Sequence, residues 1–309
     1  MSKKCSDSRM RKGYLNPMSA TPPPQNAVCS RIFSSEVMRA LAHEGRSSLL
    51  GRLIREMPTR VSGNLADVFA TAYASLSGVH ERNEYIYKNV LTSRILLGVH
   101  SLKTTTVVPE FRVGGVKADF AVFNGTSTVY EIKTERDTLR RLQKQLDYYL
   151  QLFDKIYVVA GESHLEALLA TLPSCVGLIS INQRMQRTAV REAASNMENA
   201  DPDLIFDALR TSEIDHILTT YQLPVPVVPN TLRRKAQYEL FRTLTPVQIH
   251  RGMVSAIRKY RGMLKLEGFI DSLPSSLKAV GVSFNFSLRE QNTFLHSLNT
   301  EVHDILAWA

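Results

Sequence analysis

Five side chains near the middle of this 309-residue chain have the types and order used to cut phosphodiester bonds with a metal ion. Asp119 and Glu131 offer carboxylates, which are ligands for a hard divalent cation. Lys133 offers an ammonium group that can position or activate water and offset charge at phosphorus. Gln145 and Tyr149 can steer the substrate or Lys133. Together they predict a catalytic nuclease centre that uses Mg²⁺ or Mn²⁺ as its cofactor.

A β-hairpin must position the two acids. Residues 116–123 alternate in character, Asn124-Gly125 supplies a turn, and residues 128–133 are rich in strand formers. Side chains change face at every residue, so the loop length decides whether Asp119 and Glu131 share a face. A three-residue loop brings the carboxylates together, and a two-residue loop separates them. The metal hypothesis therefore requires the three-residue loop.

The pleat of the second strand gives its residues different tasks. Glu131 and Lys133 point to one side, whereas Ile132 turns into the core. The backbone carbonyl of Ile132 is then able to complete a metal site built from oxygens. Oxygen ligands favour magnesium or manganese.

A helix is expected after this strand, capped by Thr134 or Asp137 and running to about Phe153, because leucines recur at helical spacing. Gln145 and Tyr149 are four residues apart and lie on one flank of it. Two buried strands should follow, with a helix between them; their ranges are 155–160 and 176–181, and the helix lies near 163–172.

In these residues the chain resembles the PD-(D/E)XK nuclease superfamily, whose members have the restriction-endonuclease-like fold. The matched residues are Asp119, the run Glu131-Ile132-Lys133, the pair Gln145 and Tyr149, and an upstream acidic helix over 81–85. Within the superfamily, the sequence is similar to a group of poorly characterised bacterial proteins with E-I-K-[ST] followed by D-T-L-x-R-L-x-x-Q. The family's proline before the aspartate is replaced here by Ala118.

The resemblance implies an α/β fold: a mixed central sheet flanked by helices, with N-terminal helices and a mainly helical C-terminal region. It implies that Asp119 and Glu131 ligate the metal and that Lys133 serves the attacking water. Glu84 would support a ligand or a second ion, and because it lies at the edge of its helix's apolar stripe, it is expected to point inward.

Each of these residues also has a non-catalytic interpretation. An E-x-K triplet is common on edge strands, and Glu84 could simply pair with Lys88 one helical turn later. Two further functions therefore stay open beside the metal-dependent nuclease acting on DNA, for which the resemblance implies a setting in defence against foreign DNA. One is a catalytically inactive nucleic-acid-binding or regulatory protein with this fold, and the other is an RNA nuclease that acts as a toxin.

The net charge of +9 suits a nucleic-acid partner. Residues 231–261 hold eight basic residues against one acid, which is most of the excess. DNA is the expected partner, RNA is an alternative, and a homodimer is a natural arrangement for cutting two strands. The side chains expected to contact nucleic acid are Arg141, Arg233, Arg234, Lys235, Arg258, Lys259 and Arg261.

Turn-forming residues and the periodicity of the apolar residues divide the chain into three parts. Residues 1–31 are expected to form a disordered basic tail, 32–183 the nuclease domain with its N-terminal helices, and 184–309 a mainly helical region that could contact DNA. A proline-rich linker over 222–229 separates helices in the last part, and alternation over 282–288 predicts a short strand.

Composition points to an intracellular protein. The three cysteines are too few and too scattered for a disulfide framework or a zinc cluster. No apolar run reaches the roughly 20 residues of a membrane span, and the first residues lack the apolar core of a secretion signal. A cytoplasmic location and no membrane partner are expected.

Overall fold

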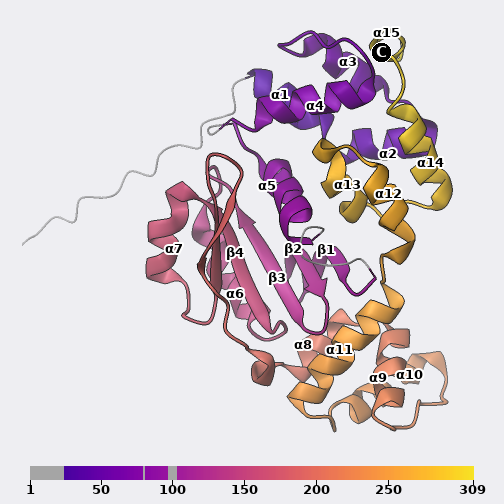
Figure 1. Cartoon of the computed structure of the whole chain (residues 1–309). Helices are drawn as coiled ribbons and strands as arrows, with labels where there is room; N and C mark the ends of the chain where they lie inside the picture. Colours follow the sequence, from indigo (N-terminus) through magenta and orange to yellow (C-terminus); the bar gives the residue numbers. More distant parts are fainter. Residues whose placement is uncertain (1–23, 79–80, 97–102) are drawn as a thin grey trace, which may run out of the picture.

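The centre of the molecule is a six-stranded mixed sheet (Figure 1). The computed structural model describes residues 24–78, 81–96 and 103–309. The strands lie in sequence order; β3, β4 and β5 are parallel to one another, and all other neighbours are antiparallel. They are β1 (Thr106–Val113), β2 (Val116–Phe123), β3 (Ser127–Lys133), β4 (Lys155–Gly161), β5 (Gly177–Ile181) and β6 (Arg187–Arg191).

The hairpin between β2 and β3 has the loop that the metal hypothesis requires. Phe123 pairs with Ser127, so the loop has the three residues 124–126, and Phe120 pairs with Tyr130. Gly125 takes a φ of 101°, which a residue with a Cβ rarely adopts. The printed ladder ends at Phe120 and Tyr130, and Asp119 reaches β3 through its side chain, whose Oδ2 accepts a hydrogen bond from the Ile132 amide at 2.7 Å. The three-residue loop that the sequence predicts is confirmed.

Six helices share a core with one face of the sheet. The apolar side chains of this core come from alternate strand positions, such as Ala121 and Val129, and from the helices. Asp201 is the N-cap of α8 and Thr245 that of α11, where Thr245 makes a capping box with Gln248. The helices are α6 (Leu142–Tyr149), α7 (Leu165–Thr171), α8 (Pro202–Ala208), α9 (Thr211–Thr220), α10 (Asn230–Phe241) and α11 (Pro246–Tyr260).

The opposite face is covered by α5 (Glu84–Leu91), which continues as a π-helix over Thr92–Leu96. The side chains of Phe120, Ile132 and Val159 meet α5 here, together with residues from α12 (Glu267–Ser272) and α13 (Lys278–Ser283). Ile132 thus turns away from Glu131 and Lys133, as the pleat predicts.

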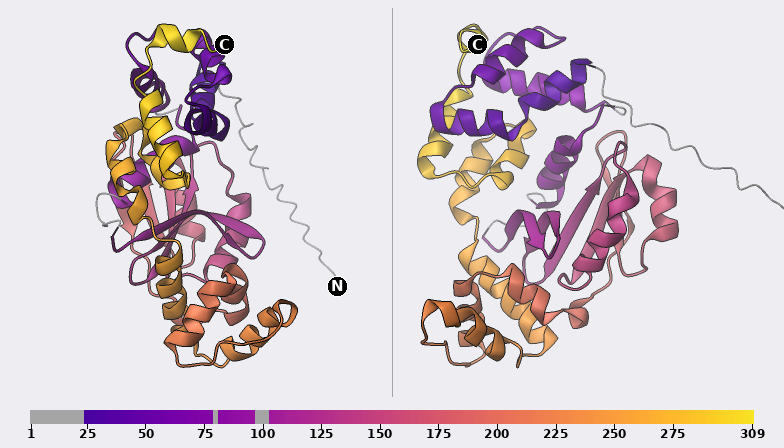
Figure 2. Two further views of the ribbon diagram at one scale, coloured as in Figure 1. Left: turned by 90° about the vertical axis from the view of Figure 1, so that its right-hand side faces the viewer. Right: turned by 180° about the vertical axis from the view of Figure 1, so that it is seen from behind.

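A third core lies at one end of the molecule, where the first described helices pack against the last ones (Figures 1 and 2). This core joins α1 (Pro24–Ile32), α2 (Ser35–Glu44), α3 (Ser48–Glu56) and α4 (Leu65–Leu76) to α12, α13, α14 (Leu288–Ser297) and α15 (Val302–Leu306). Helices α8–α11 lie at the other end of the molecule, with the sheet between.

Three sequence predictions about organisation are wrong. Helix α1 occupies part of the expected disordered tail, and its Cys29 is fully buried; residues 1–23 lie outside the described residues. Strand β6 extends the sheet beyond the domain boundary expected at 183. The strand expected over 282–288 is absent, because α13 ends at Ser283 and an irregular segment follows it.

The coarser predictions are confirmed: the chain is an α/β protein with a mixed sheet flanked by helices, and the region beyond β6 is helical. Strands β1 and β6 extend the sheet beyond the strands that the sequence predicted. Among the described residues, no helix combines the length and the apolar character needed to cross a bilayer.

Candidate active site

Glu131 is the centre of a buried polar cluster on the sheet face that carries α6. Its Oε1 accepts hydrogen bonds from Lys133 Nζ at 2.7 Å and from Gln145 Nε2 at 2.5 Å. Its Oε2 accepts one from the Tyr149 hydroxyl at 2.7 Å. Only 3% of the Glu131 side chain is exposed, against 10% for Lys133. Three elements, β2, β3 and α6, therefore bring the predicted catalytic residues to one place.

The three donors explain why a carboxylate can be buried in this position. An isolated ionised carboxylate is costly away from water, and ion pairing with charge-assisted hydrogen bonds offsets that cost. Gln145 also accepts a hydrogen bond from Lys133 at 3.0 Å, which closes the triangle of Lys133, Gln145 and Glu131. Burial, and then the Glu131 charge, raise the pKa of Tyr149, so its phenol stays protonated and serves as a donor.

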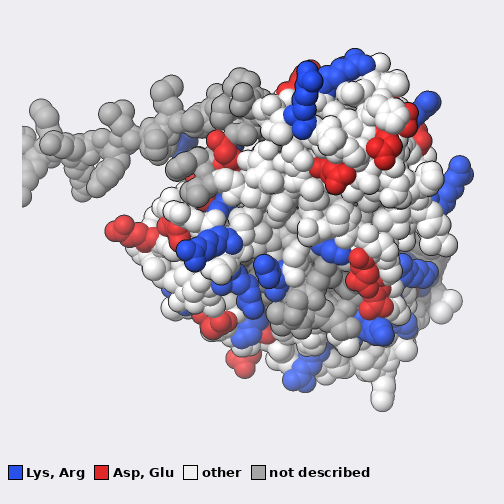
Figure 3. All heavy atoms as spheres, turned by 45° about the horizontal axis from the view of Figure 1, so that its top comes forward, with Lys and Arg blue, Asp and Glu red and all other residues white. Residues whose placement is uncertain are grey.

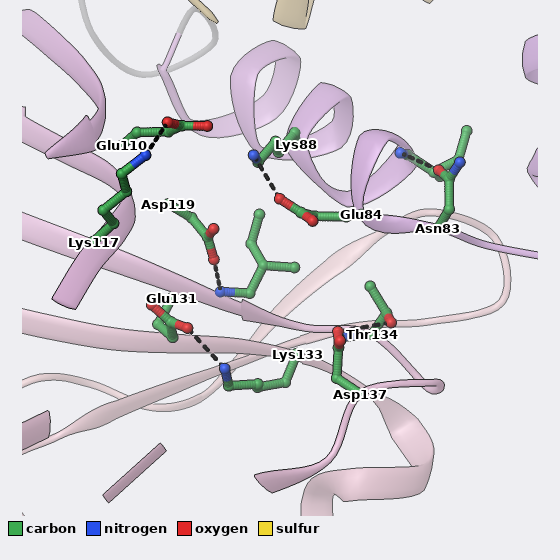
Figure 4. A network of polar contacts seen from close by, with 12 residues as sticks. Asn83, Glu84, Lys88, Glu110, Lys117, Asp119, Glu131, Lys133, Thr134 and Asp137 are labelled. Carbon is green, nitrogen blue, oxygen red and sulfur yellow. Dashed lines mark hydrogen bonds and ion pairs between the residues drawn. The ribbon is translucent and has the colours of Figure 1, made fainter. Parts of the chain in front are cut away.

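Asp119 lies beside Glu131 and is held by the backbone of the next strand. Its Oδ2 accepts a hydrogen bond from the Ile132 amide at 2.7 Å (Figure 4). Burial, and then the neighbouring Glu131 carboxylate, raise the pKa of Asp119 to about 7. Two carboxylates in such proximity repel each other, and a bound cation would relieve that repulsion.

Glu84 does not point inward. Its side chain is 59% exposed and pairs with Lys88 Nζ at 2.6 Å, one turn along α5 (Figure 4). The non-catalytic interpretation of Glu84 therefore describes its contact in this structure. Glu84 still lies close enough to Asp119 to raise the pKa of that carboxyl, while Lys88 lowers it.

Sequence reasoning missed a second ion pair at the edge of the site. Glu110 of β1 accepts a hydrogen bond from Lys117 Nζ at 2.8 Å (Figure 4). Glu110 has a φ of 49°, a left-handed conformation that is strained for a residue with a side chain. The strand that carries Glu110 was not predicted, so no pattern singled this residue out.

The turn between β3 and α6 differs from the expected helix cap. The Thr134 amide and hydroxyl both donate to Asp137 Oδ2 at 2.8 Å, which closes a turn before the helix begins. The chain then forms a 3₁₀ turn over Leu139–Arg141 and enters α6 at Leu142. Neither Thr134 nor Asp137 caps the helix, but the turn fixes where α6 begins and therefore where Gln145 and Tyr149 lie relative to Glu131.

The donor set fits a hard divalent cation. Asp119 and Glu131 are neighbouring carboxylates, and Mg²⁺ is commonly held by one or two carboxylates with water in its remaining positions. Within the described residues, no three His, Cys, Asp or Glu side chains are grouped so that they could hold an ion. The Ile132 carbonyl and Glu84 as further ligands stay predictions.

Three of the arginines predicted to contact nucleic acid instead hold the fold together. Arg261 forms a two-pronged ion pair with the fully buried Glu213, at 2.6 Å for both contacts. Arg234 lies over the Phe206 ring at 4.0 Å and donates to two backbone carbonyls. Arg233 pairs with Asp215 at 2.6 Å. The exposed members of the predicted set are Arg141, Lys235, Arg258 and Lys259.

The charged surface is mixed. On the face shown in Figure 3, basic and acidic side chains are interspersed. The net charge of +9 is therefore not gathered into one patch on that face. On this face, the predicted contact with nucleic acid would therefore come from individual basic side chains and not from one basic patch.

The fold and the site define an α/β protein with a buried acid and lysine cluster between its central strands and the following helix. The family model described as bacteriophage P4 protein cII matches residues 77–267, and the chain belongs to that family. Protein cII of Enterobacteria phage P4 is 24% identical over 161 residues, which are 51% of this chain. The matched part spans 60% of that relative's length.

A solved structure, SPO1766 of Silicibacter pomeroyi, a protein of unknown function, matches 50% of this chain and 80% of its own. The identity is 16% and the TM-score is 0.27, so this likeness carries no conclusion about the fold or function. The part of the chain that matches the cII family, residues 77–267, includes every residue of the candidate site.

Proposed function

We propose that this protein is a metal-dependent nuclease that hydrolyses phosphodiester bonds in DNA. The observation that carries the proposal is that Asp119 lies beside the hydrogen-bonded cluster of Glu131 and Lys133, which also includes Gln145 and Tyr149 of α6. An isolated E-x-K triplet is common, but a triplet whose acid and lysine are buried together beside a second carboxylate is not explained by solubility.

We further propose that the fold is the restriction-endonuclease-like one and that the chain is related to the PD-(D/E)XK nucleases. In support, an antiparallel meander of β1, β2 and β3 is followed by α6 and then by β4, parallel to β3. The acids stand on β2 and β3, and the next helix carries the glutamine and the tyrosine. This is the order that the resemblance predicts.

The chain's own residues have separate tasks in this proposal. Asp119 and Glu131 would hold a Mg²⁺ or Mn²⁺ ion, which when bound supplies an acidified water and offsets charge on the phosphate. The Lys133 ammonium orients the attacking water and stabilises negative charge on the phosphate oxygens. Gln145 and Tyr149 are positioning residues: they fix Glu131, and Gln145 also fixes Lys133.

One observation favours the alternative of an inactive nucleic-acid-binding relative. Both oxygens of Glu131 are already engaged by Lys133, Gln145 and Tyr149, so an ion has to share or displace a donor. In an inactive protein, this closed cluster would simply stabilise the sheet. The two functions therefore differ in whether Glu131 exchanges a donor for a metal ion.

The full chain is incubated with Mg²⁺ or Mn²⁺ and with plasmid DNA, linear DNA or transfer RNA. We expect cleavage of DNA that stops with EDTA and falls by about 100-fold or more in Asp119→Asn and Lys133→Gln, because each removes charge needed in the transition state. Asp207→Asn is the matched control, since Asp207 is exposed on α8. Circular dichroism checks that each variant is folded.

Cleavage of DNA that survives in both Asp119→Asn and Lys133→Gln would reject the assignment of the site. Binding of DNA without cleavage under any metal condition would favour the inactive relative. Degradation of transfer RNA with intact DNA would identify an RNA nuclease instead.

A further inference from the structure

We propose that a groove along the edge strand β1 binds a single-stranded segment of nucleic acid. The groove has a volume of about 930 Å³. This inference rests on the proposed function, because it names the form of the substrate that the nuclease would take. The groove is separate from the Glu131 cluster, and none of its lining residues belongs to that cluster.

Three segments far apart in the sequence form the walls. Residues 107–109 of β1 make one side, the segment 282–288 after α13 makes the other, and residues 260–266 after α11 close one end. The Val107 amide is held by the Met263 sulfur at 3.4 Å, which ties β1 to the closing segment. A groove of this volume is the size of a small-molecule site, so it takes a single extended chain and not a duplex.

The unpaired charge in the groove is positive. Arg210 and Lys265 line it, are exposed, and have no ion pair with any residue that the structure describes. The acid in the lining, Glu290, is already held by the Ser287 cap and by His43 at 3.0 Å. Two exposed cations beside an acid whose oxygens are already engaged suit a chain of phosphates.

Aromatic side chains stand among these cations. Tyr260 is 42% exposed at the C-terminal end of α11, and the partly buried Phe284, whose ring stacks on Phe286, lies on the facing wall. An exposed ring is a stacking platform that accepts any base. Rings interleaved with cations are typical of surfaces that bind single strands, and they favour a nucleic acid over an acidic peptide.

The groove leads to the candidate site. Pro109 lines the groove, and the next residue, Glu110, pairs with Lys117 at the edge of the site (Figure 4). A strand lying along β1 would therefore leave the groove beside the Glu110 and Lys117 pair. The favoured substrate is then DNA with a single-stranded segment next to the bond that is cut.

The test is fluorescence anisotropy of the full chain with labelled oligo-dT and with a blunt duplex of equal length, in EDTA so that nothing is cut. We expect tighter binding of oligo-dT than of the duplex. Tyr260→Ala should weaken it by roughly 5- to 150-fold, the value of one base stack, whereas Tyr260→Phe keeps the ring and retains binding. Lys265→Glu should weaken binding and lower its salt dependence.

Arg52→Glu on α3 is the matched control, because it makes the same charge change at an exposed position on another element. Equal binding by Tyr260→Ala and the unaltered chain, equal loss in Lys265→Glu and Arg52→Glu, or equal affinity for the blunt duplex would each overturn the proposal. Capture of a labelled acidic peptide in place of oligo-dT would overturn it as well. Because binding is measured without cleavage, the groove can stand even if the nuclease proposal fails.

Discussion

At the scale of single residues, the site is built around a buried carboxylate with three donors. Lys133, Gln145 and Tyr149 all donate to Glu131, while Asp119 accepts a hydrogen bond from the Ile132 amide. Burial, and then the neighbouring Glu131, raise the pKa of Asp119 to about 7. Proton and metal ion should therefore compete at Asp119 near neutral pH.

This competition predicts how stability responds to metal and pH. The pKa of Asp119 rises from 3.8 to about 7 on folding, so its ionisation costs folding free energy as the pH rises through that window. Mn²⁺ should offset this cost. We expect Mn²⁺ at 100 times its Kd to raise the free energy of unfolding by up to about 2.7 kcal/mol at about pH 8, which is measured as a higher thermal midpoint. The increase should be much smaller at about pH 6.

Asp119→Asn should remove the metal response at both pH values, and the variant without metal should be more stable than the unaltered chain at about pH 8. Asp207→Asn should behave like the unaltered chain. A metal-induced shift of equal size at both pH values, or one that persists in Asp119→Asn, would contradict competition at this carboxyl.

At the scale of elements, helix α11 separates structural from exposed basic residues. Inward, it buries His250, whose Nε2 is 2.7 Å from the Ser127 hydroxyl at the start of β3. Just after the helix, Arg261 pairs with Glu213 and lies over the Phe111 ring at 5.4 Å. Outward, Arg258 and Lys259 are exposed. Composition alone could not distinguish these roles, because all are basic residues in one segment.

Substitutions on and beside α11 should separate these two roles. Arg261→Gln leaves the fully buried Glu213 without its cation, so the free energy of unfolding should fall by about 3–5 kcal/mol. Lys259→Ala should leave stability within about 0.5 kcal/mol and weaken DNA binding, with a shallower dependence on salt. Urea unfolding and anisotropy at several salt concentrations measure the two effects.

Arg52→Ala on α3 serves as the exposed control for both measurements. Unchanged stability of Arg261→Gln would contradict the structural role of that arginine. A loss of stability in Lys259→Ala that matches its loss of binding would contradict the surface role of Lys259.

The sequence predicted those elements whose local signals agree with their surroundings. The hairpin loop forms as expected, because it depends on short-range interactions. Strand β1 was missed because Pro109 and the left-handed Glu110 interrupt its pattern. Strand β6 is almost wholly exposed, so no alternation marks it.

The false strand over 282–288 shows a limit of periodicity. Its apolar residues do alternate, but they are buried in different places. Val282 packs on the α5 face of the sheet, whereas Phe286 joins the core of the terminal helices and stacks with Phe284 at 5.3 Å. A long-range division of this kind leaves no trace in local spacing.

At the scale of the whole molecule, three cores share the chain. Two cover the faces of the sheet, and the third joins the N-terminal helices to α12–α15. The cII family match over residues 77–267 includes the sheet and α5–α11, and leaves out α1–α4, α13–α15 and all of α12 except its first residue. The candidate site therefore belongs to the part that the family shares, and the helices at the two ends form a separate packing unit.

The site's residue order could be predicted from sequence, but its closed hydrogen bonding could not. Asp119, Glu131 and Lys133 were identified by type and spacing, whereas the three donors to Glu131 and the pairing of Glu84 with Lys88 depend on how α5 and α6 pack against the sheet. These contacts decide how readily a metal ion enters.

Anomalous diffraction from crystals of the full chain soaked in Mn²⁺ tests the central claim most directly. We predict an anomalous peak about 2.0–2.4 Å from carboxylate oxygens of both Asp119 and Glu131, with Lys133 displaced from Glu131 or sharing it. Density without such a peak, with Lys133, Gln145 and Tyr149 still bonded to Glu131 at saturating Mn²⁺, would contradict a metal-dependent centre at this position.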